Sequence, residues 1–178
     1  MARRSLGCLV LVVGLIVLLI LILVFLAKSG LYNVAATYPD PVPVAWFLST
    51  TMESSVRHSA RHIEAPNLDD PAMIRAGARH YKDDCVICHG APGTRVGEVG
   101  RGLNPKPPEL AKVADDWKPK ELFWITKNGI RMSGMPVWGV VDDGDELWET
   151  VAFVRRLPKM TPAQYEDLTR ERPRQEKP

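Results

Sequence analysis

The sequence is short of cysteine, and its positive and negative charges nearly cancel. Only three of the 178 residues are cysteine, and one of them, Cys8, stands in an apolar run near the start. The formal net charge is +2 at pH 7, and no basic stripe interleaved with aromatic residues occurs. This argues against a nucleic-acid partner. Internal repeats and the alternation typical of strands are also missing, so we expect an all-α fold.

Acidic residues are absent from the first 30 positions, where the only charged side chains are Arg3, Arg4 and Lys28. The other 20 basic residues and all 21 acidic ones follow later in the chain. No charge interrupts residues 6–27. A helix of that stretch would be roughly 33 Å long, enough to cross the hydrocarbon core of a bilayer.

We therefore expect residues 1–30 to form an N-terminal transmembrane anchor that contacts the bilayer through residues 6–27. The alternative is a cleaved signal peptide, but the apolar region of such a peptide is only about 7–15 residues long, and "FLAKSG" is a poor cleavage site. The two arginines near the start should stay on the cytoplasmic side. The rest of the chain would then lie in the periplasm or another extracytoplasmic space, and Cys8 is interpreted as an inert membrane cysteine.

Beyond the anchor we expect three segments. Residues 31–69 read as a tether that includes an amphipathic helix at 43–62, because apolar residues recur there every three or four positions. The apolar side of this helix could pack on the domain, on a partner subunit or near the lipid surface. Residues 70–160 should form the one compact domain, followed by a charged tail over residues 161–178.

Capping residues place the helices of the compact domain. Asp70 and Pro71 favour a helix that starts there and runs to about Lys82 or Asp83. A second helix should begin near Pro119, and a third should cover "DGDELWETVAFVRRL". A last short helix is predicted at "PAQYEDLT", and the glycine- and proline-rich residues 90–116 should be mostly loop.

The stretch "DDCVICHG" holds Cys85, Cys88 and His89, the most informative residues in the chain. Cysteine pairs normally oxidise outside the cytoplasm, yet a disulfide across two intervening residues closes a tiny loop and stabilises little. A thioredoxin-like redox pair expects a preceding strand, which is not predicted here. A structural zinc site needs a fourth ligand, and the remaining histidines lack the usual pair spacing.

Covalent haem attachment explains the pattern better. In this chemistry the sulfurs of Cys85 and Cys88 bond to the two vinyl groups of a haem, and His89 binds the iron through Nε2. A short turn with two intervening residues can reach both vinyl groups and leave the histidine facing the metal. We therefore expect one covalently bound haem c. Such attachment takes place outside the cytoplasm, as the predicted topology requires.

Residues 70–158 resemble the class I c-type cytochromes. In that family a glycine, an aromatic residue and the first cysteine follow one another at intervals of four, as Gly77, Tyr81 and Cys85 do here. The resemblance implies a helical domain around the haem, in which the glycine lets its helix cross the C-terminal helix closely. Phe153 is the expected aromatic partner at that crossing, and Trp148 is the alternative. Thr150 departs from the family, which often has a leucine at this position.

The resemblance also implies a methionine as the second axial ligand of the iron, opposite His89. Met135, in "SGMPVWG", matches the methionine loop of the family, and a thioether opposite histidine raises the potential. Met132 is the competitor, while Met73 and Met160 are interpreted as core or surface residues. A haem with two histidine ligands, using His58 or His62, is the other alternative. Otherwise these two histidines and His80 should be solvated.

Further groups are expected around the haem from the same resemblance. A proline carbonyl after the haem motif should accept a hydrogen bond from His89. Pro105, Pro107 and Pro108 are available, of which the first and last are preferred. Side chains that could bond the haem propionates are Trp124, Trp138 and Arg131.

The resemblance predicts an electron carrier and not an enzyme. The chain would pass single electrons between membrane-bound or periplasmic redox proteins, as a shuttle or as a subunit of a hetero-oligomeric respiratory, photosynthetic or dehydrogenase complex. One alternative is a haem enzyme or a sensor of gas or peroxide with an open distal iron site. Another is an assembly scaffold with a vestigial haem.

Overall fold

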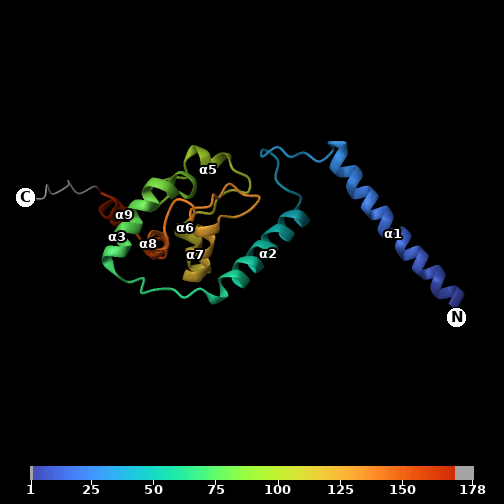
Figure 1. The fold of residues 1–178 in the computed structure, drawn as a ribbon. Coiled ribbons are helices and arrows are strands. Elements are labelled where there is room, and N and C mark those ends of the chain that lie inside the picture. Colours follow the sequence, from blue (N-terminus) through green and yellow to red (C-terminus); the bar gives the residue numbers. More distant parts are fainter. Residues whose placement is uncertain (1, 171–178) are drawn as a thin grey trace, which may run out of the picture. The chain divides into compact units, whose positions relative to one another are not determined.

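The computed structural model describes residues 2–170, which form helices joined by loops (Figure 1). Within that range there is no β-strand, only an isolated bridge between Ala91 and Thr94. The predicted all-α fold is therefore confirmed. By its internal contacts the chain divides into two compact units, the first ending at Tyr38 and the second beginning at Pro39.

The first unit is dominated by α1 (Ala2–Ser29). Residues Leu6–Ser29 are long and apolar enough to cross a membrane, judged by length and composition, and none of the residues in their most apolar stretch is buried. A signal sequence near an N-terminus meets the same criteria. The anchoring role of this helix thus stays a prediction.

The second unit begins with α2 (Val42–Ser59) and the 3-10 turn η1 (Ala60–His62), which confirms the helix expected at 43–62. The C-terminal half of α2 packs on the domain. Val56 and Ala60 are buried there, and the guanidinium of Arg57 lies 5.8 Å from the ring centroid of Trp117. Three surfaces were considered for the apolar side of this helix. The C-terminal half of the helix packs on one of them, the domain itself.

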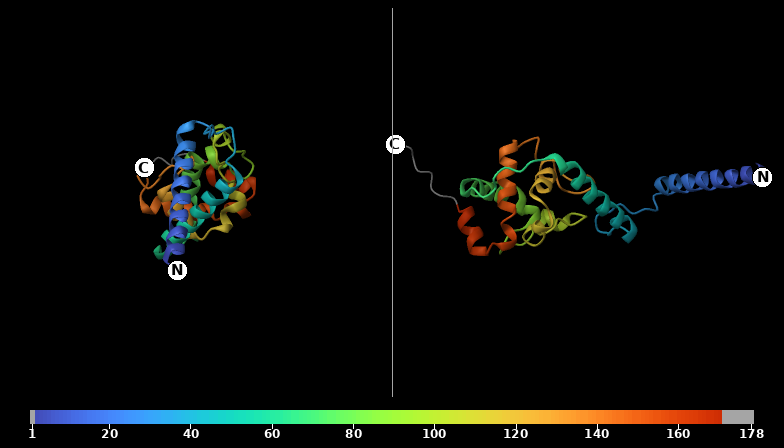
Figure 2. Two further views of the ribbon diagram at one scale, coloured as in Figure 1. Left: turned by 90° about the vertical axis from the view of Figure 1, so that its right-hand side faces the viewer. Right: turned by 90° about the horizontal axis from the view of Figure 1, so that it is seen from below.

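The centre of the domain is the packing of α3 (Pro71–His80) on α8 (Gly144–Val154), seen in Figures 1 and 2. Capping starts each helix at a defined residue. An Asp70 carboxylate oxygen accepts a 2.8 Å hydrogen bond from the backbone N–H of Ala72. Asp143 accepts two, from the N–H groups of Asp145 and Glu146. Both helix starts agree with the prediction from sequence.

Phe153 is the aromatic residue at this crossing. Its side chain is fully buried, and its ring centroid lies 5.3 Å from that of Tyr81. Trp148, the alternative, instead stacks on Phe123 at 4.1 Å. Thr150 is buried with its hydroxyl bonded to the Glu146 carbonyl at 3.1 Å, which explains how a polar residue is accommodated where leucine is common.

Helix α3 continues without a break into a π-helical turn, η2 (Tyr81–Cys85), and then into α4 (Val86–His89). The remaining elements are short, except α7, and surround the α3–α8 pair. They are α5 (Glu98–Gly102), α6 (Leu110–Val113), η3 (Ala114–Asp116), α7 (Pro119–Asn128), η4 (Leu157–Lys159) and α9 (Pro162–Thr169).

The last of these helices, α9, is the one predicted at "PAQYEDLT", and it packs on α3. Its Tyr165 is buried, with the ring centroid 6.2 Å from that of Phe153. The packed part of the chain therefore extends beyond residue 160, up to Thr169. The end of the charged tail, residues 171–178, lies outside the described residues.

Candidate haem-binding site

The two thiols of the motif lie one turn apart, at the end of η2 and within α4. Cys85 and Cys88 are both half-buried and unpaired. Burial, and to a smaller extent the nearby carboxylates of Asp84 and Asp142, raise the pKa of the Cys85 thiol to about 12. Among the residues that the structure describes, no group of three His, Cys, Asp or Glu side chains is arranged to hold a metal ion, so the zinc alternative gains no support.

His89 ends α4, and its imidazole is held by one backbone group. Its Nδ1 donates a 2.8 Å hydrogen bond to the carbonyl oxygen of Pro108. Of the prolines considered from sequence, Pro108 is thus the one in contact. Burial lowers the pKa of His89, while the bond to Pro108 acts in the opposite direction. A neutral imidazole whose Nδ1 carries the proton leaves the Nε2 lone pair for a metal.

Tyr81 fixes the backbone at the end of the motif. Its hydroxyl, within a buried ring, donates a 2.6 Å hydrogen bond to the carbonyl oxygen of Gly90. Gly90 has a φ of +66°, and a Cβ placed on it would lie 2.9 Å from the Thr94 carbonyl oxygen. Sequence reasoning placed Tyr81 in the helix spacing but missed this bond, because it joins residues on opposite sides of the motif.

Helix α5 packs on α4 through two glycines that sequence reasoning also missed. A Cβ added to Gly97 would lie 2.6 Å from the carbonyl oxygen of Ile87, and one added to Gly100 would lie 2.5 Å from that of Cys88. Backbone thus meets backbone directly beneath the turn that carries the thiols. The signal for this contact was the spacing of glycines in "GEVG".

The methionine loop follows α7 and is stiffened by local contacts. The Ser133 hydroxyl donates to the Ile130 carbonyl at 2.7 Å and accepts from the N–H of Met135 at 3.1 Å. Gly129, at φ +64°, lies so close that a Cβ would be 2.8 Å from the carbonyl oxygen of Met135. Met135 is half-buried in this loop, whereas Met132 is 73% exposed. These contacts favour Met135 over its competitor.

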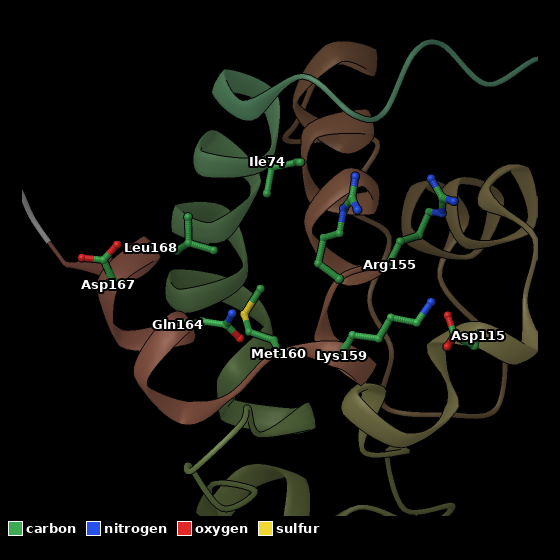
Figure 3. Close-up of a pocket in the computed structure, with 9 residues that line it drawn as sticks. Ile74, Asp115, Arg155, Lys159, Met160, Gln164, Asp167 and Leu168 are labelled. Atoms are coloured by element: carbon green, nitrogen blue, oxygen red, sulfur yellow. The ribbon is translucent and has the colours of Figure 1, made fainter.

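The methionine loop also touches the segment that follows the haem motif. A Cβ added to Gly134 would lie 2.6 Å from both methyl carbons of Leu103, just beyond α5. The other two methionines lie elsewhere. Met73 packs against the core cluster, and Met160 lines an open pocket with Ile74 and Leu168, between α3 and α9 (Figure 3).

The histidines outside the motif take two different roles. His58 and His62 are exposed and contact Arg61, as expected for solvated residues. His80, which we expected to be solvated, is half-buried, and its Nε2 lies 3.2 Å from a carboxylate oxygen of Glu149 on α8. Of the side chains considered for propionate binding, Trp124 and Trp138 are half-buried and Arg131 is exposed.

The residues present fit a c-type haem. Two unpaired thiols one turn apart, a neutral oriented imidazole and a half-buried thioether are the donors that such a group requires. Large apolar side chains on the elements that carry these donors are about half exposed, and would suit the face or edge of a macrocycle. They are Ile87 on α4 (51% exposed), Val99 on α5 (51%) and Val137 in the methionine loop (46%).

Comparison with known proteins agrees with this chemistry. Residues 72–154 match the family described as "Cytochrome C oxidase, cbb3-type, subunit III". That range runs from α3 through the thiols, His89 and the methionine loop to the end of α8. The chain is also similar to the quinohemoprotein alcohol dehydrogenase of Comamonas testosteroni, with 31% identity over 86 residues. The similarity covers 48% of this chain but only 11% of that relative.

Proposed function

Because residues 72–154 form a class I c-type cytochrome domain, we propose that this chain is a membrane-anchored monohaem cytochrome that transfers single electrons between redox partners on the outer face of the cytoplasmic membrane. The observation that carries the proposal is the 2.8 Å hydrogen bond from His89 Nδ1 to the carbonyl oxygen of Pro108. His89 directly follows Cys88, whose thiol is unpaired. The haem would supply reversible one-electron chemistry at its iron.

The protein contributes attachment and fixed ligands. Cys85 and Cys88 hold the cofactor covalently, and His89 and Met135 are the axial ligands in this proposal. The Pro108 carbonyl fixes the plane of the imidazole, and Ser133 together with Gly129 fixes the backbone around Met135. Ligands that are held by the fold move little when the charge of the metal changes, which suits electron transfer and not the binding of a substrate.

Anchoring through residues 6–27 of α1 would keep the domain at a high local concentration beside membrane-bound donors and acceptors. A role as a subunit of a larger complex is supported by the two comparisons. One names a subunit of an oxidase, and the other is an enzyme in which a segment similar to this chain makes up 11% of the length. In this proposal the chain itself is an electron carrier, and the catalytic chemistry belongs to its partners.

The test is to produce the full chain with the haem c maturation machinery and extract it in mild detergent. We expect a pyridine haemochrome spectrum and an intact mass with one added haem, both lost in Cys85→Ala and Cys88→Ala. A redox titration should show one reversible one-electron step. Chains that copurify would identify the partners, and a free monomer would argue against the subunit role.

The same preparation separates an electron carrier from an enzyme or sensor with an open distal site. If Met135 fills the sixth position, the reduced protein should bind carbon monoxide slowly or not at all. Rapid binding to the wild-type protein, together with a high-spin oxidised spectrum, would contradict the carrier proposal.

A further inference from the structure

The N-terminal half of α2 is apolar and uncovered, although its C-terminal half is packed on the domain. Val42 is 82% exposed, Trp46 66% and Phe47 61%. No charged residue occurs between Val42 and Met52, and the first charge in the helix, Glu53, pairs with Arg57 at 3.2 Å. The helix thus changes from an apolar end to a polar end along its axis.

These exposed apolar side chains surround the helix and do not form a single stripe. Val42 and Trp46 are four residues apart and share one side, while Val44 and Phe47 are three apart and share another. The centres of the two sides are separated by roughly 150°, at the rotation of about 100° per residue that follows from about 3.6 residues per turn. A groove on a protein would cover one side of such a helix, whereas a lipid interface contacts all sides of an inserted end.

The backbone at this end is also suited to a medium with little water. A helix normally begins with several N–H groups that lack partners. At the start of α2, Pro41 is the N-cap residue and Pro43 is the second residue of the helix. Neither proline has an N–H group. The N–H of Val44 and that of Ala45 both donate to the Pro41 carbonyl, at 2.8 and 3.0 Å. Few unpaired donors would have to enter the lipid.

The length of the connection places this helix within reach of the bilayer. Only residues 30–41 separate the end of α1 from the start of α2. Fully extended, twelve residues span at most roughly 40 Å, and less in any bent conformation. Tryptophan and other large amphipathic or aromatic residues are typical of helices that lie about 5–10 Å deep in the interface.

From these observations we infer that residues 42–48 insert into the lipid interface of the membrane that holds α1, as a second contact beside the transmembrane anchor. The inference rests on the anchoring role proposed for α1. Because Val56 in the C-terminal half of α2 and Ala60 in η1 are buried, and both elements pack on α7, insertion of the other end of α2 would orient the whole domain on the membrane.

The test uses spin labels on the full chain, in nanodiscs that hold one copy in phosphatidylcholine and phosphatidylglycerol. In a Cys8→Ser background, single labels are placed by Phe47→Cys, by Ser54→Cys and by Ile16→Cys. Ser54 is the matched control, because it lies seven residues after Phe47, on the same side of α2, and is exposed. A labelling ratio of one per chain verifies that Cys85 and Cys88 are not free.

Power saturation then compares collisions with oxygen, which enters lipid, and with a water-soluble nickel chelate, with the haem in the same oxidation state in all samples. We expect the oxygen-to-nickel ratio at position 47 to exceed that at position 54 several-fold and to approach that at position 16. A high ratio at 16 with equally low ratios at 47 and 54 would overturn the insertion of α2 and leave the anchor intact. A low ratio at all three would contradict the anchor as well.

Discussion

Gly77 on α3 lies directly against the backbone of Glu149 on α8, so that a Cβ added to the glycine would be 1.8 Å from the Glu149 carbonyl oxygen. The nearest side-chain atom is the Cβ of Phe153, at 3.0 Å. Since one obstructing group is a backbone carbonyl of α8 and the other is a Cβ fixed to that backbone, neither can turn away. The two helices can approach this closely only because position 77 has no side chain.

Gly77→Ala should therefore destabilise the domain strongly. Forcing a methyl group into a packed core costs about 1–3 kcal/mol, and the upper end of this range applies here because the backbone must shift. Chemical denaturation of the haem-loaded protein, followed by far-ultraviolet circular dichroism, would measure the loss. Gly144→Ala is the matched control, because no atom lies within 4 Å of its added Cβ, and it should leave stability nearly unchanged. Equal stability of the two variants would show that the crossing is looser than described.

Tyr81→Phe should lower the free energy of unfolding by about 1–3 kcal/mol, because it leaves the Gly90 carbonyl without its 2.6 Å hydrogen bond. The ring that packs on Phe153 is kept in this variant. The measurement is the free energy of unfolding in urea. Tyr165→Phe is the control, since no hydrogen bond of its hydroxyl occurs within residues 2–170. A decrease in the free energy of unfolding that occurs only in the Tyr165 variant would contradict the role given to Tyr81.

Met135→Leu should lower the midpoint potential and give rapid carbon monoxide binding, because leucine keeps the volume of methionine but has no donor sulfur. The thioether-to-iron charge-transfer band of the oxidised protein should disappear. Met132→Leu, at the exposed position three residues earlier, should change none of these properties. If the two variants exchange these outcomes, Met132 is the ligand.

Asp142→Asn should stabilise the domain at neutral pH, by less than about 1 kcal/mol for a largely solvated charge. Burial first, and then the nearby Glu146 and Asp84, raise the pKa of Asp142 above its usual 3.8. Its ionised form is therefore disfavoured in the fold relative to the unfolded chain, and stability is lost as the pH rises through the folded pKa. The gain of the variant should vanish below about pH 3.8, where both states are protonated.

Thermal unfolding across this pH range would measure the gain from Asp142→Asn. Asp145→Asn is the control, because Asp145 lies in the first turn of α8. A negative charge at that end stabilises a helix. It should give no gain at any pH. A stabilisation that persists below pH 3.8 would mean that removal of the charge is not its cause.

Local signals predicted the helix starts and the central crossing well. Asp70 and Asp143 cap their helices through bonds to residues two or three positions away, so their effect is visible in a short window of sequence. The crossing was implied by the resemblance to the class I c-type cytochromes, which the interval from Gly77 to Tyr81 carries, and it depends on one residue without a side chain.

Contacts between distant residues were not predictable in the same way. His80 was expected in solvent, but its partner Glu149 lies 69 positions later on another helix. Three prolines could have oriented His89, and the choice of Pro108 depends on the path of a loop. The burial of Tyr165 follows from the docking of α9 on α3, which an eight-residue helix does not reveal by its own pattern.

The π-helical turn at Tyr81–Cys85 sets a constraint on chain length. A π turn closes hydrogen bonds one residue later than an α turn, so Cys85 is rotated relative to the side of α3 that carries Gly77 and Tyr81. If residues 81–85 closed as an ordinary α-helix at unchanged length, everything after them would be rotated by roughly 100° relative to α3, because about 3.6 residues complete a turn. The extra residue in this segment and the π turn that absorbs it therefore belong together, and a variant that kept the length but lost the turn would aim the thioether bonds at the wrong side of the porphyrin.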